Sequence, residues 1–199
     1  MVSPYEKCPI FENENYLLRL VEASDAPDLL LVYSDEKAVP FFNSDNCNGD
    51  DFHYTTLERM QSAIEFWLWA YKDKGFVRWV IIDKKAHQAI GTIELFNRGG
   101  QDQGSDSQSE PKDYFNNCGL LRLDLRSDYE RTESIREIMS QIVQPTFELF
   151  ACRMIATKIP PFADQRKAAA EQLGFALSEE KLIGGDDNRV YTDYFVLLK

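Results

Sequence analysis

The sequence is poor in the residues that build metal sites and disulfide frameworks. It contains two histidines, His53 and His87, too few for a histidine-rich metal site and scarcely enough for a serine–histidine triad. It also has four cysteines, whose positions match no metal-ligand or disulfide spacing. We therefore expect no bound metal and reduced thiols in a cytoplasmic protein. The cysteines are Cys8, Cys47, Cys118 and Cys152.

Positive charge and long apolar runs are also scarce. With 22 Lys and Arg against 33 Asp and Glu, the net charge is −11, which disfavours nucleic-acid binding because that depends on neutralising phosphates. No apolar run approaches the roughly 18 residues of a membrane span, and the N-terminus lacks the pattern of a signal peptide. We expect no nucleic-acid or membrane partner, and an acidic surface that favours cationic or amine partners.

The chain has 199 residues, of which 44% are hydrophobic and 28% charged, and this suits one globular domain over residues 1–199. Apolar periodicity predicts both strands and helices. A strand and a helix are expected within 15–35, with Pro27 in the first helical turn. Further helices are expected at 55–75, 134–150 and 164–175, and strands at 76–83, 89–97, 117–125, 152–159 and 189–198.

The order of these elements predicts a mixed α/β sheet with helices on both faces. Residues 118–159 form a strand–helix–strand unit, which requires a right-handed parallel crossover. Residues 76–83 and 89–97 are close enough to form an antiparallel pair. The polar stretch 98–113 is rich in Gly, Ser and Gln, so we expect a mobile loop that is dispensable for folding. Gly75 is predicted to close the helix before the first of these strands.

Several phrases in sequence order resemble the GNAT acyl-CoA N-acyltransferases, particularly the ribosomal-protein N-terminal and antibiotic acetyltransferases. They are "NYLLRLVEASDAPDLL", "IGTIELFN", "LDLRSDY", "EQLGF" and "YTDYFVLL". The resemblance implies a GNAT-like fold in which two parallel strands, "GLLRLDL" and "CRMIATKI", splay apart. It also implies transfer of an acetyl group from acetyl-CoA to a primary amine of a small molecule or a peptide N-terminus. Whether the protein forms a homodimer is left open.

In this family the pantetheine arm of CoA pairs with the first of the splayed strands, and the pyrophosphate rests on the next helix N-terminus. The resemblance thus implies cofactor contacts from Leu123, Leu125, Arg126, Arg131, Thr132, Ser134 and Arg136.

The phosphate junction nevertheless departs from the family pattern Q/R-x-x-G-x-G/A, because "LDLRSDYERTESIREIM" contains no glycine. One alignment to this pattern puts Glu130, Glu133 and Ile135 at its Q/R, first glycine and second small-residue positions. An alignment shifted by one residue puts Arg131, Ser134 and Arg136 at the same three positions. The family's Asn and Ser of the last helix fall on Ala163 and Arg166, and its general-acid Tyr falls on Ala170.

Ser134 and Glu137 match a capping box, so we expect the helix to cap itself and to hold pyrophosphate weakly or not at all. The arginines near this helix start either bind phosphate or pair with Glu130, Glu133 and Glu137; both alternatives stay open.

Glu94 and Asp124 are the predicted candidates for the general base, because burial in an apolar strand would raise a carboxyl pKa toward a useful value. Each is equally interpretable as an ordinary carboxylate on the face of a sheet. Loop 38–54 lies where the family shapes its acceptor site, and five of its residues are candidates for holding an amine: Phe41, Phe42, Asp45, Asp50 and Asp51. The alternative is a solvated loop with two residues anchored in the core. The alternative function is a GNAT-like domain that has lost CoA binding and serves as a binding or regulatory module.

Overall fold

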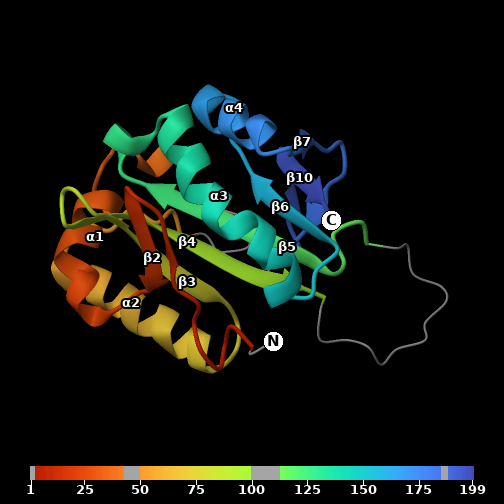
Figure 1. Ribbon diagram of the computed structural model, residues 1–199. Helices are drawn as coiled ribbons and strands as arrows, with labels where there is room; N and C mark the ends of the chain where they lie inside the picture. Colours follow the sequence, from red (N-terminus) through yellow and green to blue (C-terminus); the bar gives the residue numbers. More distant parts are fainter. Residues whose placement is uncertain (1–2, 43–49, 100–112, 185–187) are drawn as a thin grey trace.

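The computed structural model describes residues 3–42, 50–99, 113–184 and 188–199 of the chain. Its centre is an eight-stranded mixed sheet with the order β1-β2-β3-β4-β5-β6-β10-β7 (Figure 1). The strands are β1 (Phe11–Glu12), β2 (Tyr16–Leu20), β3 (Val77–Asp83), β4 (Gln88–Arg98), β5 (Cys118–Leu125), β6 (Met154–Lys158), β7 (Ala176–Leu177) and β10 (Tyr194–Leu198). The α-helices are α1 (Ala26–Tyr33), α2 (Leu57–Lys72), α3 (Thr132–Leu149) and α4 (Asp164–Gln172). Three 3-10 turns accompany them: η1 (Ala23–Asp25), η2 (Val39–Phe41) and η3 (Ser127–Tyr129).

The predicted parallel crossover is confirmed. β5 and β6 run parallel, and α3 connects them. Only three residue pairs join the two strands, the last being Leu120 with Ala156. Beyond that pair β5 continues to Leu125 and β6 to Lys158, so the strands diverge toward their carboxyl ends. All other neighbouring strands in the sheet are antiparallel, including the predicted pair β3 and β4.

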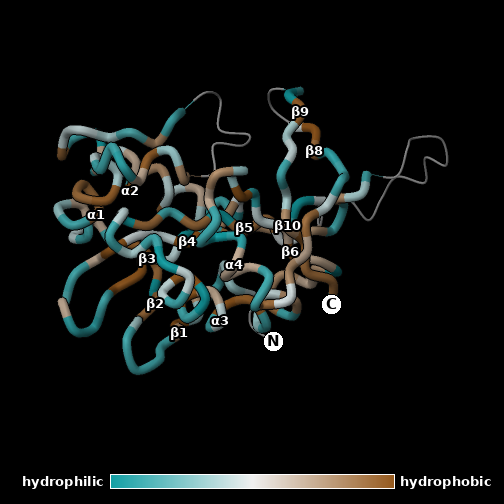
Figure 2. The backbone as a smooth tube through the Cα atoms, turned by 90° about the horizontal axis from the view of Figure 1, so that it is seen from above, coloured by the Kyte–Doolittle hydropathy of each residue, from teal (hydrophilic) through white to brown (hydrophobic). Residues whose placement is uncertain are grey.

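Helices cover both faces of the sheet, as predicted. Figure 2 shows α1 and α2 on one side of the strands and α3 and α4 on the other. Successive residues of a strand point to opposite faces. On β5, Leu121, Leu123 and Leu125 therefore pack in the same cluster as α3, while Arg122 and Asp124 face α1 and α2. The charged side chains of β5 thus lie on one face only.

Local hydrogen bonds cap helix α2 at both ends. Thr56 accepts a hydrogen bond from the backbone N–H of Arg59, which is the usual N-cap arrangement. The prediction that Gly75 closes the helix was wrong in detail. The left-handed residue is Lys74, with φ of 62°, and the N–H of Gly75 returns to the carbonyl of Ala70.

The predicted capping box of α3 was wrong. The helix begins at Thr132, so Ser134 lies inside its first turn. Glu137 accepts a hydrogen bond from Asn15 at 2.8 Å instead of turning back to the helix start. The backbone N–H of Thr132 donates to Oε1 of Gln165 on α4 at 3.1 Å. A side chain that is remote in sequence therefore binds the first backbone donor of this helix, where a local capping motif was expected.

The predicted last strand is divided in two. Val190–Tyr191 forms β9, which pairs with β8 (Leu182–Ile183) in a separate hairpin, and β10 follows after Asp193, whose φ is 66°. Figure 2 shows this hairpin rising on the same side of the sheet as α2. Most of the predicted loop 98–113 lies outside the described residues, as does Asp45. Among the described helices, none is both long and apolar enough to cross a membrane.

Candidate active site

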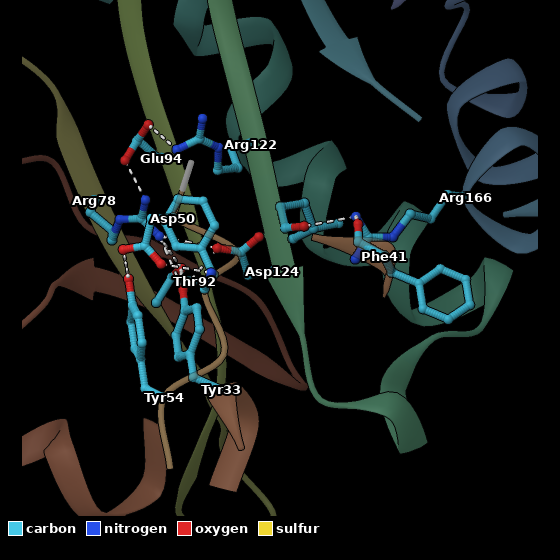
Figure 3. Close-up of polar contacts among 12 residues, drawn as sticks. Tyr33, Phe41, Asp50, Tyr54, Arg78, Thr92, Glu94, Arg122, Asp124 and Arg166 are labelled. Atoms are coloured by element: carbon cyan, nitrogen blue, oxygen red, sulfur yellow. Dashed lines mark hydrogen bonds and ion pairs between the residues drawn. The ribbon is translucent and has the colours of Figure 1, made fainter. Parts of the chain in front are cut away.

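A row of charged side chains crosses three adjacent strands on the face covered by α1 and α2 (Figure 3). Arg78 on β3 lies opposite Glu94 on β4, which lies opposite Arg122 on β5. Arg78 donates through Nη2 to Oε2 of Glu94, and Arg122 donates through Nη1 to Oε1 at 3.2 Å. Directly opposed residues have Cβ atoms only about 4.5–5.5 Å apart. The register of the strands therefore brings this row together.

Arg78 also reaches the next row of the sheet. Its Nη1 donates to Thr92 at 3.0 Å, to the hydroxyl oxygen of Tyr33 at 3.0 Å and to Oδ2 of Asp124 at 3.2 Å. The Tyr33 hydroxyl, from α1, donates to the same Asp124 oxygen at 2.8 Å. Burial alone would lower the pKa of Arg78, but Glu94, Tyr33 and Asp124 more than offset it, so its pKa is raised. Arg78 is therefore a permanently charged centre of this network.

The structure buries both predicted base candidates, with Glu94 4% and Asp124 0% exposed. Their surroundings differ from the expectation, however, because Arg78 contacts both carboxylates. A buried charge is normally paired in this way, since an unpaired one is costly. The expected apolar environment was wrong, and the assignment of either residue as a general base stays a prediction.

A cavity of about 610 Å³ opens above the charged row, between α2 and the β8–β9 hairpin. Glu94 and Arg122 line its floor, and its lining also includes Leu120 and Ala156. These two residues form the last pair between β5 and β6. The cavity therefore meets the sheet at the point where the two parallel strands separate.

The rim of this cavity on α2 is aromatic. Phe66 and Trp69 stack on each other with ring centroids 5.9 Å apart, although their residues are 55% and 59% exposed. An exposed aromatic pair beside a cavity offers an apolar surface to a ligand. Asp50, from the predicted acceptor loop, lines the same cavity and accepts from Arg59 at 2.8 Å.

The other candidate residues of that loop have different surroundings. Asp51 accepts a hydrogen bond from the backbone N–H of His53 at 2.9 Å. Phe42 is buried against Tyr33, so it acts as a core residue. Phe41 lies on the opposite side of β5 from the charged row, close to Arg166 (Figure 3).

Arg166 fills the space between the diverging strands. It projects from α4 and donates through Nη1 to the carbonyl oxygens of Leu123 at 2.8 Å and Phe41 at 2.7 Å. Its Nε donates to Glu130 at 3.0 Å, and Nη2 donates to the other oxygen of that carboxylate. The remaining cavity there is about 10 Å³, room for no more than about one water molecule.

The resemblance to the GNAT enzymes implies acetyl-CoA in this cleft between β5 and β6, and in this conformation its residues do not fit that ligand. The carbonyl of Leu123, the predicted partner of pantetheine, accepts from Arg166. The first N–H of α3, predicted to face pyrophosphate, donates to Gln165. Both groups that CoA would need are thus bound by side chains of α4.

The other predicted cofactor contacts have different surroundings. Leu125 is buried opposite Gly91 of β4. Arg126 ion-pairs with its neighbour Asp128. Arg131 and Arg136 are exposed, and among the described residues neither forms an ion pair with Glu130, Glu133 or Glu137. The alternative that they pair with these glutamates is therefore not supported.

Sequence reasoning missed Arg78 and Arg122, and it named Glu130 and Arg166 without predicting that they pair. One signal was available, since a charged residue inside an otherwise apolar strand, such as Arg78 in "FVRWVIID", requires a buried counterion. No local signal joins Glu130 to Arg166, which lie 36 positions apart.

Comparison with solved structures shows the fold. The chain is similar to the ribosomal-protein-S5-alanine acetyltransferase of Vibrio fischeri, with 19% identity, coverage of 94% of each chain and a TM-score of 0.65. It is similar to RimL, a ribosomal L7/L12 alpha-N-protein acetyltransferase solved in complex with coenzyme A, with 12% identity, 96% and 98% coverage and a TM-score of 0.67. A Salmonella typhimurium acetyl transferase that modifies the N-terminal serine of L7/L12 gives 13% identity, 96% and 99% coverage and a TM-score of 0.65.

A search of curated proteins gave no significant match. The sequence does match the family described as acetyltransferase (GNAT) domain over residues 15–176. That match covers most of the chain, including the charged row, the cavity floor and the diverging strands. The chain belongs to the GNAT acetyltransferase family.

Proposed function

We propose that the protein is an N-acetyltransferase that takes its acceptor, a primary amine of a small molecule or of a peptide N-terminus, into the cavity beside α2. Acetyl-CoA is the donor that membership of the family implies. The observation that carries the proposal is the position of the cavity, because Leu120 and Ala156 place its base where the two parallel strands part. An acceptor bound there would reach the donor cleft from the opposite face of the sheet.

The cavity has the size and chemistry for such an acceptor. A volume of about 610 Å³ lies within the range of roughly 300–1,000 Å³ that is usual for small-molecule sites. Both Glu94 oxygens accept from arginines, but a carboxylate oxygen has two lone pairs, so each can accept one further bond from an amine. The aromatic rim would hold the apolar remainder of the acceptor.

The test is acetyl transfer from acetyl-CoA to a panel of primary amines and N-terminal peptides, detected by product mass and by release of the CoA thiol. Trp69→Ala should raise KM for the preferred acceptor at least about tenfold, the effect of losing roughly 1.4 kcal/mol of apolar contact. Leu31→Ala is the matched control, because Leu31 is 49% exposed on α1 and does not line the cavity. Failure to acetylate any amine class would reject the proposal.

The closed cleft favours a second candidate, a GNAT-fold module that binds an amine ligand in the cavity without using CoA. Its supporting observation is that Arg166 occupies the donor position. Amine binding without any CoA binding, measured by calorimetry, would favour this candidate over the enzyme.

A further inference from the structure

Two parts of the chain face each other across the gap between β5 and β6, and contacts between side chains connect them. We call these two parts the edges of the gap. One edge comprises η2, the carboxyl end of β5 and the start of α3, and the other comprises α4 with the loop that precedes it. The Phe41 and Phe162 rings meet across the gap with centroids 5.4 Å apart in an edge-on arrangement. Gln165 accepts from both the backbone N–H and the hydroxyl of Thr132, at 3.1 and 2.6 Å. Arg166 makes the remaining contacts.

The Arg166–Glu130 pair is the strongest of these ties. Arg166 is 4% exposed and the Glu130 side chain 7%. Two guanidinium nitrogens donate to the two carboxylate oxygens, an arrangement in which a charged pair is most strongly bound. The third nitrogen, Nη1, donates hydrogen bonds to the carbonyl oxygens of Leu123 and Phe41. A single side chain therefore connects α4 to three segments of the opposite edge.

These ties use the groups that a ligand in the cleft would need. Leu123 contributes a carbonyl of β5 beyond its last pair with β6, and Thr132 contributes a backbone N–H of the first helical turn, where anions usually bind. An arm of CoA cannot enter while Arg166 and Gln165 occupy them. Opening needs no change in strand pairing, because β5 and β6 are already unpaired beyond Leu120 and Ala156.

From these contacts we propose that Arg166 and Glu130 form a latch that closes the donor cleft, so that CoA binds only to molecules in which the latch is broken. The inference rests on the proposed function, since it concerns the donor of that reaction. A ligand that binds only the open form has an apparent Kd equal to its intrinsic Kd divided by the open fraction. The latch thus makes donor binding depend on how often α4 releases β5.

The test is calorimetric titration with CoA of the wild-type protein, Glu130→Gln and the double variant Glu130→Gln/Arg166→Leu. The double variant leaves no unpaired buried charge, which protects its folding. If at least nine molecules in ten are latched, both variants should bind CoA about tenfold or more tightly than wild type. Arg19→Met is the matched control, because it removes a similar two-nitrogen pair with Asp25 far from the cleft, and its affinity for CoA should equal that of wild type.

Three outcomes are distinguishable. Tighter binding in both latch variants supports the proposal. Equal and tight binding in wild type and variants overturns the latch while leaving the proposed function intact. Absence of CoA binding in all of them, with folding verified by circular dichroism, overturns the latch together with CoA as donor.

A second measurement follows the latch directly in the wild-type protein, with one variant used only to assign the signal. A buried, ion-paired Arg166 should give a slowly exchanging Nε–H signal in nitrogen-15 NMR, assigned by its loss in Arg166→Leu. Saturating CoA should abolish or shift this signal. A CoA complex in which the signal is unchanged would overturn the latch even if Glu130→Gln and the double variant failed to fold.

Discussion

Replacement of Arg78 by methionine tests whether the charged row holds the sheet and α1 together. The substitution preserves most of the apolar stem but removes the guanidinium that contacts Glu94 and Asp124. It also removes a contact in which the guanidinium lies 4.2 Å from the centre of the Trp67 ring. Two carboxylates that are 4% and 0% exposed would then lose their shared counterion.

The expected loss of unfolding free energy depends on the contacts that the two carboxylates keep. Removing one partner of a buried ion pair typically costs about 3–5 kcal/mol. Glu94 keeps Arg122 at 3.2 Å, and Asp124 keeps the Tyr33 hydroxyl at 2.8 Å, so we expect about 4 kcal/mol for Arg78→Met. For a chain of this length that lowers Tm by roughly 8–16 °C.

The assay is urea and thermal unfolding at neutral pH, followed by circular dichroism. Arg59→Met is the control, since its pair with Asp50 is more exposed and should contribute about 1 kcal/mol or less. The triple variant Arg78→Met/Glu94→Gln/Asp124→Asn removes the orphaned charges and should recover half or more of the loss. A loss below about 1 kcal/mol in Arg78→Met, or a triple variant no more stable than the single one, would refute the reasoning.

Two further changes probe the surroundings of Asp124. Gly91→Ala should destabilise the protein by about 2 kcal/mol or more in urea unfolding, because an added Cβ would lie 2.2 Å from the Asp124 carbonyl oxygen; unchanged stability would show that β4 and β5 can move apart freely. Burial, followed by the charge of Asp124, raises the pKa of Tyr33 well above its usual value near 10. The folded protein therefore keeps this proton above about pH 10 while the unfolded chain loses it, and stability should fall there by up to about 1.4 kcal/mol per pH unit. Tyr33→Phe should be less stable at neutral pH but should show a shallower alkaline decline between about pH 10 and pH 12; an identical slope would contradict the raised pKa.

The elements and their order were largely predictable because they depend on local patterns. Apolar residues at helical spacing identified α2, and Pro27 marked the first turn of α1. The short distance in sequence between β3 and β4 identified them as an antiparallel pair. The length between β5 and β6 required a crossover, which fixed them as parallel. Chirality and chain length restrict these choices before any side chain is placed.

The charged site depended on register, which sequence alone does not specify for distant strands. Burial of Glu94 and Asp124 followed from the apolar strands around them. Their environment depended on Arg78, which lies 16 and 46 positions away. A shift of one residue in pairing would have turned these side chains to the opposite face. The pairing of strand β3 with β4 therefore decided that these carboxylates would be ion-paired with Arg78.

The sequence by itself determined that the phosphate junction has no glycine, and hence that its helix start differs from the pattern of the family. Only the tertiary structure decided what takes the place of that pattern. Gln165 and Arg166 come from α4, more than thirty positions after the groups they bind. The local capping signal of Ser134 and Glu137 failed because the helix begins two residues earlier, at Thr132, where Gln165 binds the first backbone N–H, and Glu137 accepts from Asn15 instead. Local patterns fix where helices and strands form, whereas partners for buried polar groups are chosen only when the chain brings distant segments together.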